Sequence, residues 1–172
     1  MASTTPNTIL LNSVGHTHLK EAPAAGTITP GDFLERATDG DFQRQATAKV
    51  CGPKLIAIEN DLVSGLISTD YAAADNVRAA YLKSGDEVYA FVPASAAAIV
   101  IGDHLVFDGT GCVIKGDKSA AAALSTGNTY TDAAVNSGID AAIEGARIVA
   151  TALEAVDNSG GGSKARIKIE IL

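Results

Sequence analysis

Residues able to perform chemistry are few in this chain of 172 residues, and three aspartates in a repeated setting are the first candidates. Each of them follows a glycine and stands two places before an apolar residue, in Gly31-Asp32, Gly85-Asp86 and Gly102-Asp103. Three carboxylates brought together could act as general acid and base. Glycine, however, tolerates positive φ, and an aspartate side chain bonds nearby backbone N–H groups. The repeated spacing therefore favours three turns that each start a strand over a carboxylate cluster.

Histidine and cysteine, the common metal ligands, do not make a complete site at any familiar spacing. His16 and His18 would point to one face of a strand, but no third ligand stands nearby. His104 directly follows a Gly-Asp pair and is expected at the surface. Cys51 and Cys112 are interpreted as small core residues; a disulfide stays open, although their spacing gives it no support. We predict no metal and no cofactor.

The sequence lacks the motifs of the common enzyme classes, so we expect a protein that is not an enzyme. It contains no Gly-x-Ser-x-Gly elbow, phosphate-binding loop, His-Glu-x-x-His motif or paired-cysteine motif. A net charge of −7 without a basic block argues against a nucleic-acid partner, because Lys and Arg must neutralise phosphates. No apolar stretch is long enough to span a bilayer, and the N-terminus does not read as a signal peptide. We therefore expect synthesis in a cytoplasm and no membrane partner.

The elements that must hold these residues are short strands with tight turns between them, which predicts a mainly β protein. Asp39-Gly40 marks the turn of a hairpin, and residues 54–59 form the next expected strand. Residues 62–67 fit either a strand or a loop. The Ala-rich residues 72–82 fit either a short helix or an irregular loop.

The C-terminal part predicts a hairpin. Residues 165–172 alternate isoleucine with charged residues and are the clearest strand in the chain. Residues 147–156 contain good helix formers, but their alternation favours a strand, apolar on both faces. The polar residues 116–146 fit a surface insertion in a domain that covers residues 28–172.

Residues 1–27 have the composition of an extended N-terminal arm. The arm holds one apolar run whose residues are the candidates for contact with a partner: Thr8, Ile9, Leu10, Leu11 and Val14. Residues 20–26 are interpreted as a flexible spacer behind this run. The run can either join the main sheet or pair with another chain, and both alternatives stay open. If it pairs outside, removal of residues 1–27 leaves a folded domain that has lost its attachment.

The order of these motifs resembles the head decoration proteins of tailed bacteriophages, which are also called capsid cement proteins. The resemblance rests on the three Gly-Asp turns in sequence, followed by residues 148–156 and 165–169 of the terminal hairpin. It implies a small β-barrel or β-tulip-like domain of short strands, with an extended N-terminal arm and at most one or two short helices. It also favours a strand over a helix for residues 147–156.

The resemblance implies a structural virion protein on the outer surface of the expanded capsid. Such a protein would bind the major capsid protein, form a homotrimer and cement neighbouring capsid subunits without catalysis. Weak contacts suffice for this task when a trimer engages several sites at once. The alternative is a carbohydrate- or receptor-binding module on the virion, for which exposed aromatic rings are typical. Tyr130, in the polar residues 116–146, is the ring most suited to that role.

Overall fold

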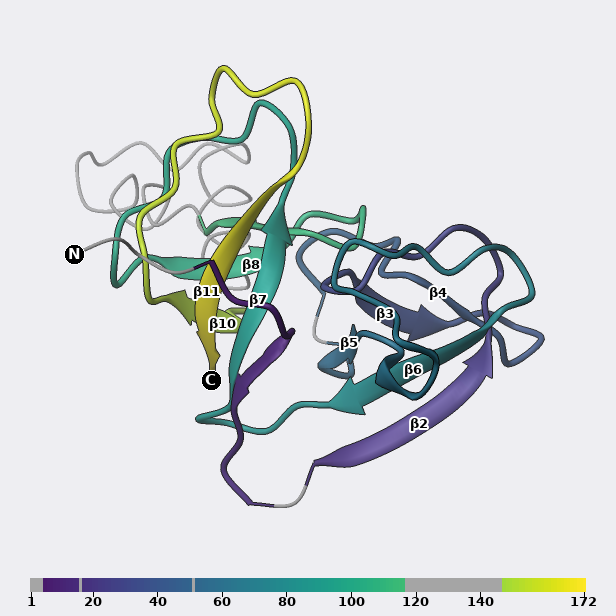
Figure 1. Cartoon of the computed structure of the whole chain (residues 1–172). Helices are drawn as coiled ribbons and strands as arrows, with labels where there is room; N and C mark the ends of the chain where they lie inside the picture. The colour runs from purple at the N-terminus through teal and green to yellow at the C-terminus, as the bar shows by residue number, and fades with distance from the viewer. Residues whose placement is uncertain (1–4, 16, 51, 117–146) are drawn as a thin grey trace, which may run out of the picture.

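The computed structural model describes residues 5–15, 17–50, 52–116 and 147–172, and its regular structure is almost entirely β (Figure 1). The strands are β1 (Leu10–Asn12), β2 (His18–Pro23), β3 (Phe33–Arg36), β4 (Phe42–Arg44), β5 (Leu55–Ala57), β6 (Asn76–Tyr81), β7 (Glu87–Val92), β8 (His104–Phe107), β9 (Val113–Lys115), β10 (Ala150–Ala152) and β11 (Ala165–Ile171). The one helical element among these residues is the 3₁₀ turn η1 (Asp61–Val63). The prediction of a mainly β fold with at most one or two short helices is therefore confirmed.

The strands form two antiparallel sheets that lie side by side (Figure 1). The six-stranded sheet has the order β1-β7-β11-β10-β8-β9, and the five-stranded sheet has the order β2-β6-β5-β3-β4. Neither sheet closes into the barrel that the resemblance implied. The five-stranded sheet comes nearest to closure, because Ala24, just after β2, forms a single bridge to Phe42 of β4.

Two hydrophobic cores explain why so many strands are buried on both faces. The larger core lies between the sheets, where Phe33 and Ile56 pack with Val88 and Ile169. The smaller core covers the other face of the five-stranded sheet and contains Phe42 and nine further buried residues. The middle strands of the five-stranded sheet, β5 and β6, are thus covered on both faces, whereas most of β2 at its edge is exposed.

The predicted hairpins are confirmed. In the terminal one, Ala150 pairs with Ile171 and Ala152 with Ile169. In the hairpin of β3 and β4, Leu34 pairs with Arg44. The described part of residues 116–146, Gly116, follows β9, and the rest of that segment lies outside the described residues.

Two sequence interpretations were wrong in the five-stranded sheet. The expected flexible spacer at residues 20–26 contributes most of β2, which pairs with β6 from His18–Tyr81 to Pro23–Asn76. Residues 72–82, expected as a helix or loop, contain β6 itself. Ala79 and Ala80 are fully buried, Ala80 in the larger core and Ala79 in the smaller one, so packing overrides the helix preference of alanine. Because β1 and β2 belong to the sheets, removal of residues 1–27 would remove two strands.

The Gly-Asp pairs form one recurring turn, and each turn precedes a strand. In the turns before β3, β7 and β8, the glycine has a φ of 100°, 89° and 85° respectively. The aspartate carboxylate accepts the N–H three residues earlier: Thr29 N to Asp32 Oδ2 2.9 Å, Lys83 N to Asp86 Oδ2 2.8 Å and Val100 N to Asp103 Oδ2 2.9 Å. In each turn the aspartate carboxylate thus provides the hydrogen-bond acceptor for the backbone N–H of the first turn residue.

A fourth copy of this turn starts β6 and was missed in the sequence. Ala72 N donates to Asp75 Oδ2 at 2.7 Å, and Ala74 stands in place of the glycine with a φ of 68°. The apolar residue two places on is Val77, as in the other three copies. Alanine is disfavoured at positive φ, so this copy of the turn carries a local strain.

Candidate interaction surface

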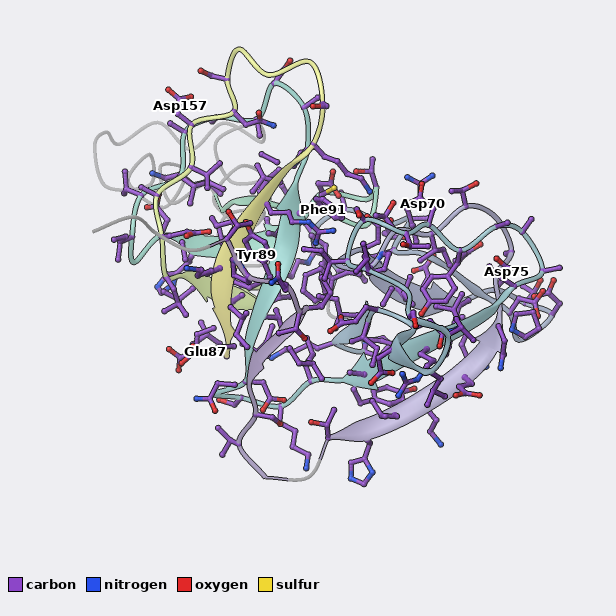
Figure 2. All side chains as sticks on the ribbon, in the orientation of Figure 1. Asp70, Asp75, Glu87, Tyr89, Phe91 and Asp157 are labelled. Carbon is purple, nitrogen blue, oxygen red and sulfur yellow. The ribbon has the colours of Figure 1, made fainter. Side chains whose placement is uncertain are left out.

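Charged side chains gather around Phe91 of β7, where β7 and β11 meet the loops of the five-stranded sheet (Figure 2). Lys164 Nζ is 2.7 Å from Oδ1 of the fully buried Asp32 and 4.1 Å from the centre of the Phe91 ring. The Arg166 guanidinium stacks over the same ring at 4.1 Å and donates to the carbonyl of Pro30 at 2.9 Å. Burial lowers the pKa of Arg166 from its ordinary value. These contacts join the two sheets, so we assign the cluster to the fold and not to a binding site.

Asp86 connects a predicted turn to the predicted contact run. Its Oδ2 closes the turn, while Oδ1 accepts from the backbone N–H of Val14 at 2.7 Å and from Ser13 Oγ at 3.1 Å. Asp86 is 1% exposed, so these bonds form largely out of water, where they are stronger. The N-terminal segment is therefore tied to the six-stranded sheet beyond the end of β1.

The candidate residues of the N-terminal run differ in burial. Ile9 is fully buried in the core between the sheets, and Leu10 pairs with Val88 of β7. Leu10 and Leu11 are half-buried, Thr8 is exposed, and Val14 is 58% exposed. Of the alternatives left open by the sequence, the run takes the first: it joins its own sheet.

Glu59 connects the start of this run to the five-stranded sheet through hydrogen bonds. Its carboxylate accepts from the backbone N–H of Ile9 at 3.1 Å and from the Thr8 hydroxyl. Glu59 follows β5, so the N-terminal segment crosses from one sheet to the other. Residues that the sequence placed in a free arm thus help to hold the two sheets together.

A cleft of about 280 Å³ opens between the N-terminal segment and the five-stranded sheet, and we call it the N-terminal cleft. It is lined by Thr8, Leu10, Thr17, Leu19, Ile58, Glu59, Asp61 and Arg78. Leu19 of β2 is 46% exposed there, and Arg78 forms an ion pair with Asp61. The lining combines apolar side chains with charged ones, which suits a side chain of another protein.

The loop after β5 carries the densest group of exposed large apolar side chains among the described residues. Leu62, Val63 and Leu66 are 76%, 73% and 65% exposed, and we call them the apolar loop. The loop begins at η1, and the first residue of η1, Asp61, also lines the N-terminal cleft. Its sequence was ambiguous between strand and loop, and the signal was an apolar run interrupted by Ser64-Gly65 without strand alternation. Neighbouring exposed apolar side chains are typical of surfaces that meet another protein.

The remaining candidates for chemistry offer little to a substrate. Across the described ranges, no group of three or more His, Cys, Asp or Glu residues could hold a metal ion. Cys112 is buried, and burial raises the pKa of its thiol to about 11, so the reactive thiolate is scarce. Cys51 and His16 lie outside the described residues. No described helix is long and apolar enough to cross a membrane.

Comparison with known proteins gives a likeness at the level of the fold. No family model and no curated protein matches the sequence. Among solved structures, the chain is similar to the N base of head fiber gp8.5 from bacteriophage phi29, with a TM-score of 0.50 and 11% sequence identity. The match covers 91% of this chain and 95% of the phage chain. At this identity the likeness shows a shared fold, extending over nearly the whole of both chains.

Proposed function

We propose that the chain is a structural protein of a tailed-phage virion that binds the outer surface of the expanded head and cements neighbouring major capsid subunits. The observation that carries the proposal is the fold shared with the N base of a phage head fiber, over 91% of this chain. The order of the Gly-Asp turns and the terminal hairpin, which resembles that of decoration proteins, supports it independently.

The surface that meets the head in this proposal is the apolar loop together with the N-terminal cleft. Burying a large aliphatic side chain contributes about 1.5–3 kcal/mol at most, so three such side chains can supply a useful anchor. The exposed Val14 extends this surface towards the six-stranded sheet. The buried Ile9 contributes through the fold and not through contact with a capsid subunit.

Cementing requires that one molecule engage more than one capsid subunit. A homotrimer meets this requirement, because the second and third contacts form at the high effective concentration set by the first. The net charge of −7 favours solubility of many copies before they reach the head. Light scattering of the purified chain tests the trimer directly.

The alternative, a carbohydrate- or receptor-binding module, finds less support. Tyr71 and Tyr89 are 5% and 8% exposed, and burial raises the pKa of both hydroxyls. Tyr81 is half-buried, and Tyr130 lies outside the described residues. Binding on a glycan array without attachment to heads would favour this alternative over cementing.

Co-sedimentation with expanded, undecorated heads of the phage that encodes the chain tests the proposal. The double variant Leu62→Ser/Val63→Ser should bind heads at least about tenfold more weakly, since it loses the apolar anchor. The matched control is Val100→Ser/Ile101→Ser, which removes two residues that are 55% and 69% exposed in the turn before β8. Equal loss in both variants would contradict the assigned surface, and absence of wild-type binding would contradict the function.

A further inference from the structure

Strand β2 lies along the outer edge of the five-stranded sheet and has β6 as its one neighbour in the sheet (Figure 1). We propose that this edge accepts an extended segment of a partner protein that carries basic side chains at alternate positions. The partner adds a strand to the sheet, and its basic side chains face the N-terminal cleft. The inference rests on the proposed function only for the partner's identity, which is then a capsid subunit.

The pairing with β6 fixes which backbone groups of β2 point outwards. Residues of an antiparallel pair alternate between hydrogen-bonded and non-hydrogen-bonded positions. Ala24 donates to Asp75 O at 2.8 Å, in the same register that pairs Glu21 with Arg78. Counting back from Ala24, the even-numbered residues bond β6, whereas Leu19 and Glu21 direct their N–H and C=O groups away from it.

A bond on the far side of β6 supports this assignment independently. Arg78 O accepts from Ile58 N at 3.0 Å, so the backbone of Arg78 is directed away from β2. Its opposite residue, Glu21, is therefore in a non-hydrogen-bonded pair with it. Within the described ranges, the outer edge of β2 meets no other strand before the single bridge at Ala24. An incoming strand finds two free donors, at Leu19 and Glu21.

The charges beside this edge select the partner. Leu19 and Glu21 alternate with Lys20, so they share the face of the sheet on which Leu19 lines the N-terminal cleft. On that face Glu21, Glu59 and Asp61 supply three carboxylates, whereas Arg78 supplies one guanidinium, which leaves two negative charges. Basic side chains on an added strand would pair with them.

A second copy of the chain is a poorer occupant of the same edge. Every copy brings the same carboxylates and a net charge of −7. Lysine on an edge strand is also a common guard against pairing between identical edges, and β2 carries Lys20 at its centre. The edge therefore favours a basic partner over itself.

The test uses the full chain and a capped hexapeptide, Lys-Val-Lys-Val-Lys-Val, with Glu-Val-Glu-Val-Glu-Val as the charge control. NMR titration should show binding of the lysine peptide at least about tenfold tighter than that of the glutamate peptide, weakening in 1 M salt. Amide exchange should slow at Leu19 and Glu21 in the complex, because these N–H groups gain acceptors. Unchanged exchange at both residues, or equal binding of the two peptides, would overturn the proposal.

A pair of variants separates the contribution of the Glu21 backbone N–H to peptide binding from that of the Glu21 side chain. Glu21→Pro removes the outward N–H, and Glu21→Ala removes the same side-chain contacts with Asn76 and Arg78 but keeps that N–H. Peptide binding should fall about tenfold further in the proline variant than in the alanine variant, since a donor to the added strand is lost. Equal affinities in two variants that both keep the wild-type circular dichroism spectrum would overturn the edge assignment.

Two further measurements distinguish which partner occupies the edge and whether failure lies in this inference or in the proposed function. A dimer of the wild type in analytical ultracentrifugation that disappears in Glu21→Pro would assign the edge to a second copy and overturn the basic partner. Heads that bind wild type and Glu21→Pro equally would overturn the inference while leaving the proposed function intact. Heads that bind neither, with the lysine peptide still protecting Leu19 and Glu21, would reject the proposed function and keep the edge.

Discussion

The run at residues 9–11 and the apolar loop at residues 62–66 are both rich in large aliphatic residues, yet the first joins a sheet and the second lies exposed at the surface. Ile9 is fully buried and its strand pairs with β7, whereas Leu62 is 76% exposed. The first run has an open sheet edge and the Glu59 carboxylate to receive its backbone donors. The second is turned by η1 and cannot continue as a strand. The backbone partners within reach of an apolar run, and not its hydrophobicity, decide whether it becomes core or surface.

The largest effect expected from this comparison is on stability. Ile9→Ala should lower the free energy of unfolding by about 2–4 kcal/mol, because it leaves a cavity in the core between the sheets. Leu62→Ala should change it by less than about 0.5 kcal/mol, since its side chain is already in water. Urea unfolding of both variants measures the difference. Similar losses in the two variants would refute the contrast drawn here.

The next effect concerns the bonds that hold the N-terminal run in place. Asp86→Ala should lower the free energy of unfolding by about 2–3 kcal/mol, because it leaves the N–H groups of Val14 and Lys83 without their acceptor. Asp103→Ala, at a half-buried turn, should cost about 1 kcal/mol.

Hydrogen exchange supplies the control for this pair of variants. The amide of Val14 should exchange faster in Asp86→Ala and at the wild-type rate in Asp103→Ala. Unchanged exchange of Val14 in both variants would mean that the run is held by its side chains alone, and the role given to Asp86 would be wrong.

The smallest effect concerns the four turns that start β3, β6, β7 and β8. Ala74→Gly should raise the free energy of unfolding by about 0.5–1 kcal/mol, because glycine adopts the positive φ of 68° without the strain that the alanine Cβ causes. Gly85→Ala should lower it by about 1 kcal/mol or more, as a Cβ there would lie 3.0 Å from Val14 Cγ2. Thermal unfolding measures both changes. The same sign in both variants would show that the two turns are not equivalent.

Local features of the fold could be predicted from the sequence, because they depend on neighbouring residues. The Gly-Asp turns, the hairpin at Asp39-Gly40 and the terminal hairpin all belong to this class. The fourth turn was missed because Ala74 replaces the glycine, although the spacing from Asp75 to Val77 was visible.

Features that depend on distant residues could not be predicted in the same way. Residues 20–26 have the composition of a spacer, and β2 exists because β6, far along the chain, offers it a partner edge. The two alanines in β6 are buried by residues far along the chain, Ala80 in the larger core and Ala79 in the smaller one. The candidate site followed the same rule: Leu10 and Thr8 were named from sequence, but the cleft they line needs Leu19 and Arg78 of the other sheet.

Cryo-electron microscopy of expanded heads, with and without the purified chain, tests the central claim most directly. The account predicts added density on the outer surface that spans the boundary between neighbouring capsid subunits, with the apolar loop and the edge of β2 facing the shell. Density confined to a single subunit would contradict cementing. Heads that remain bare at saturating concentrations of the chain would contradict the proposed virion role itself.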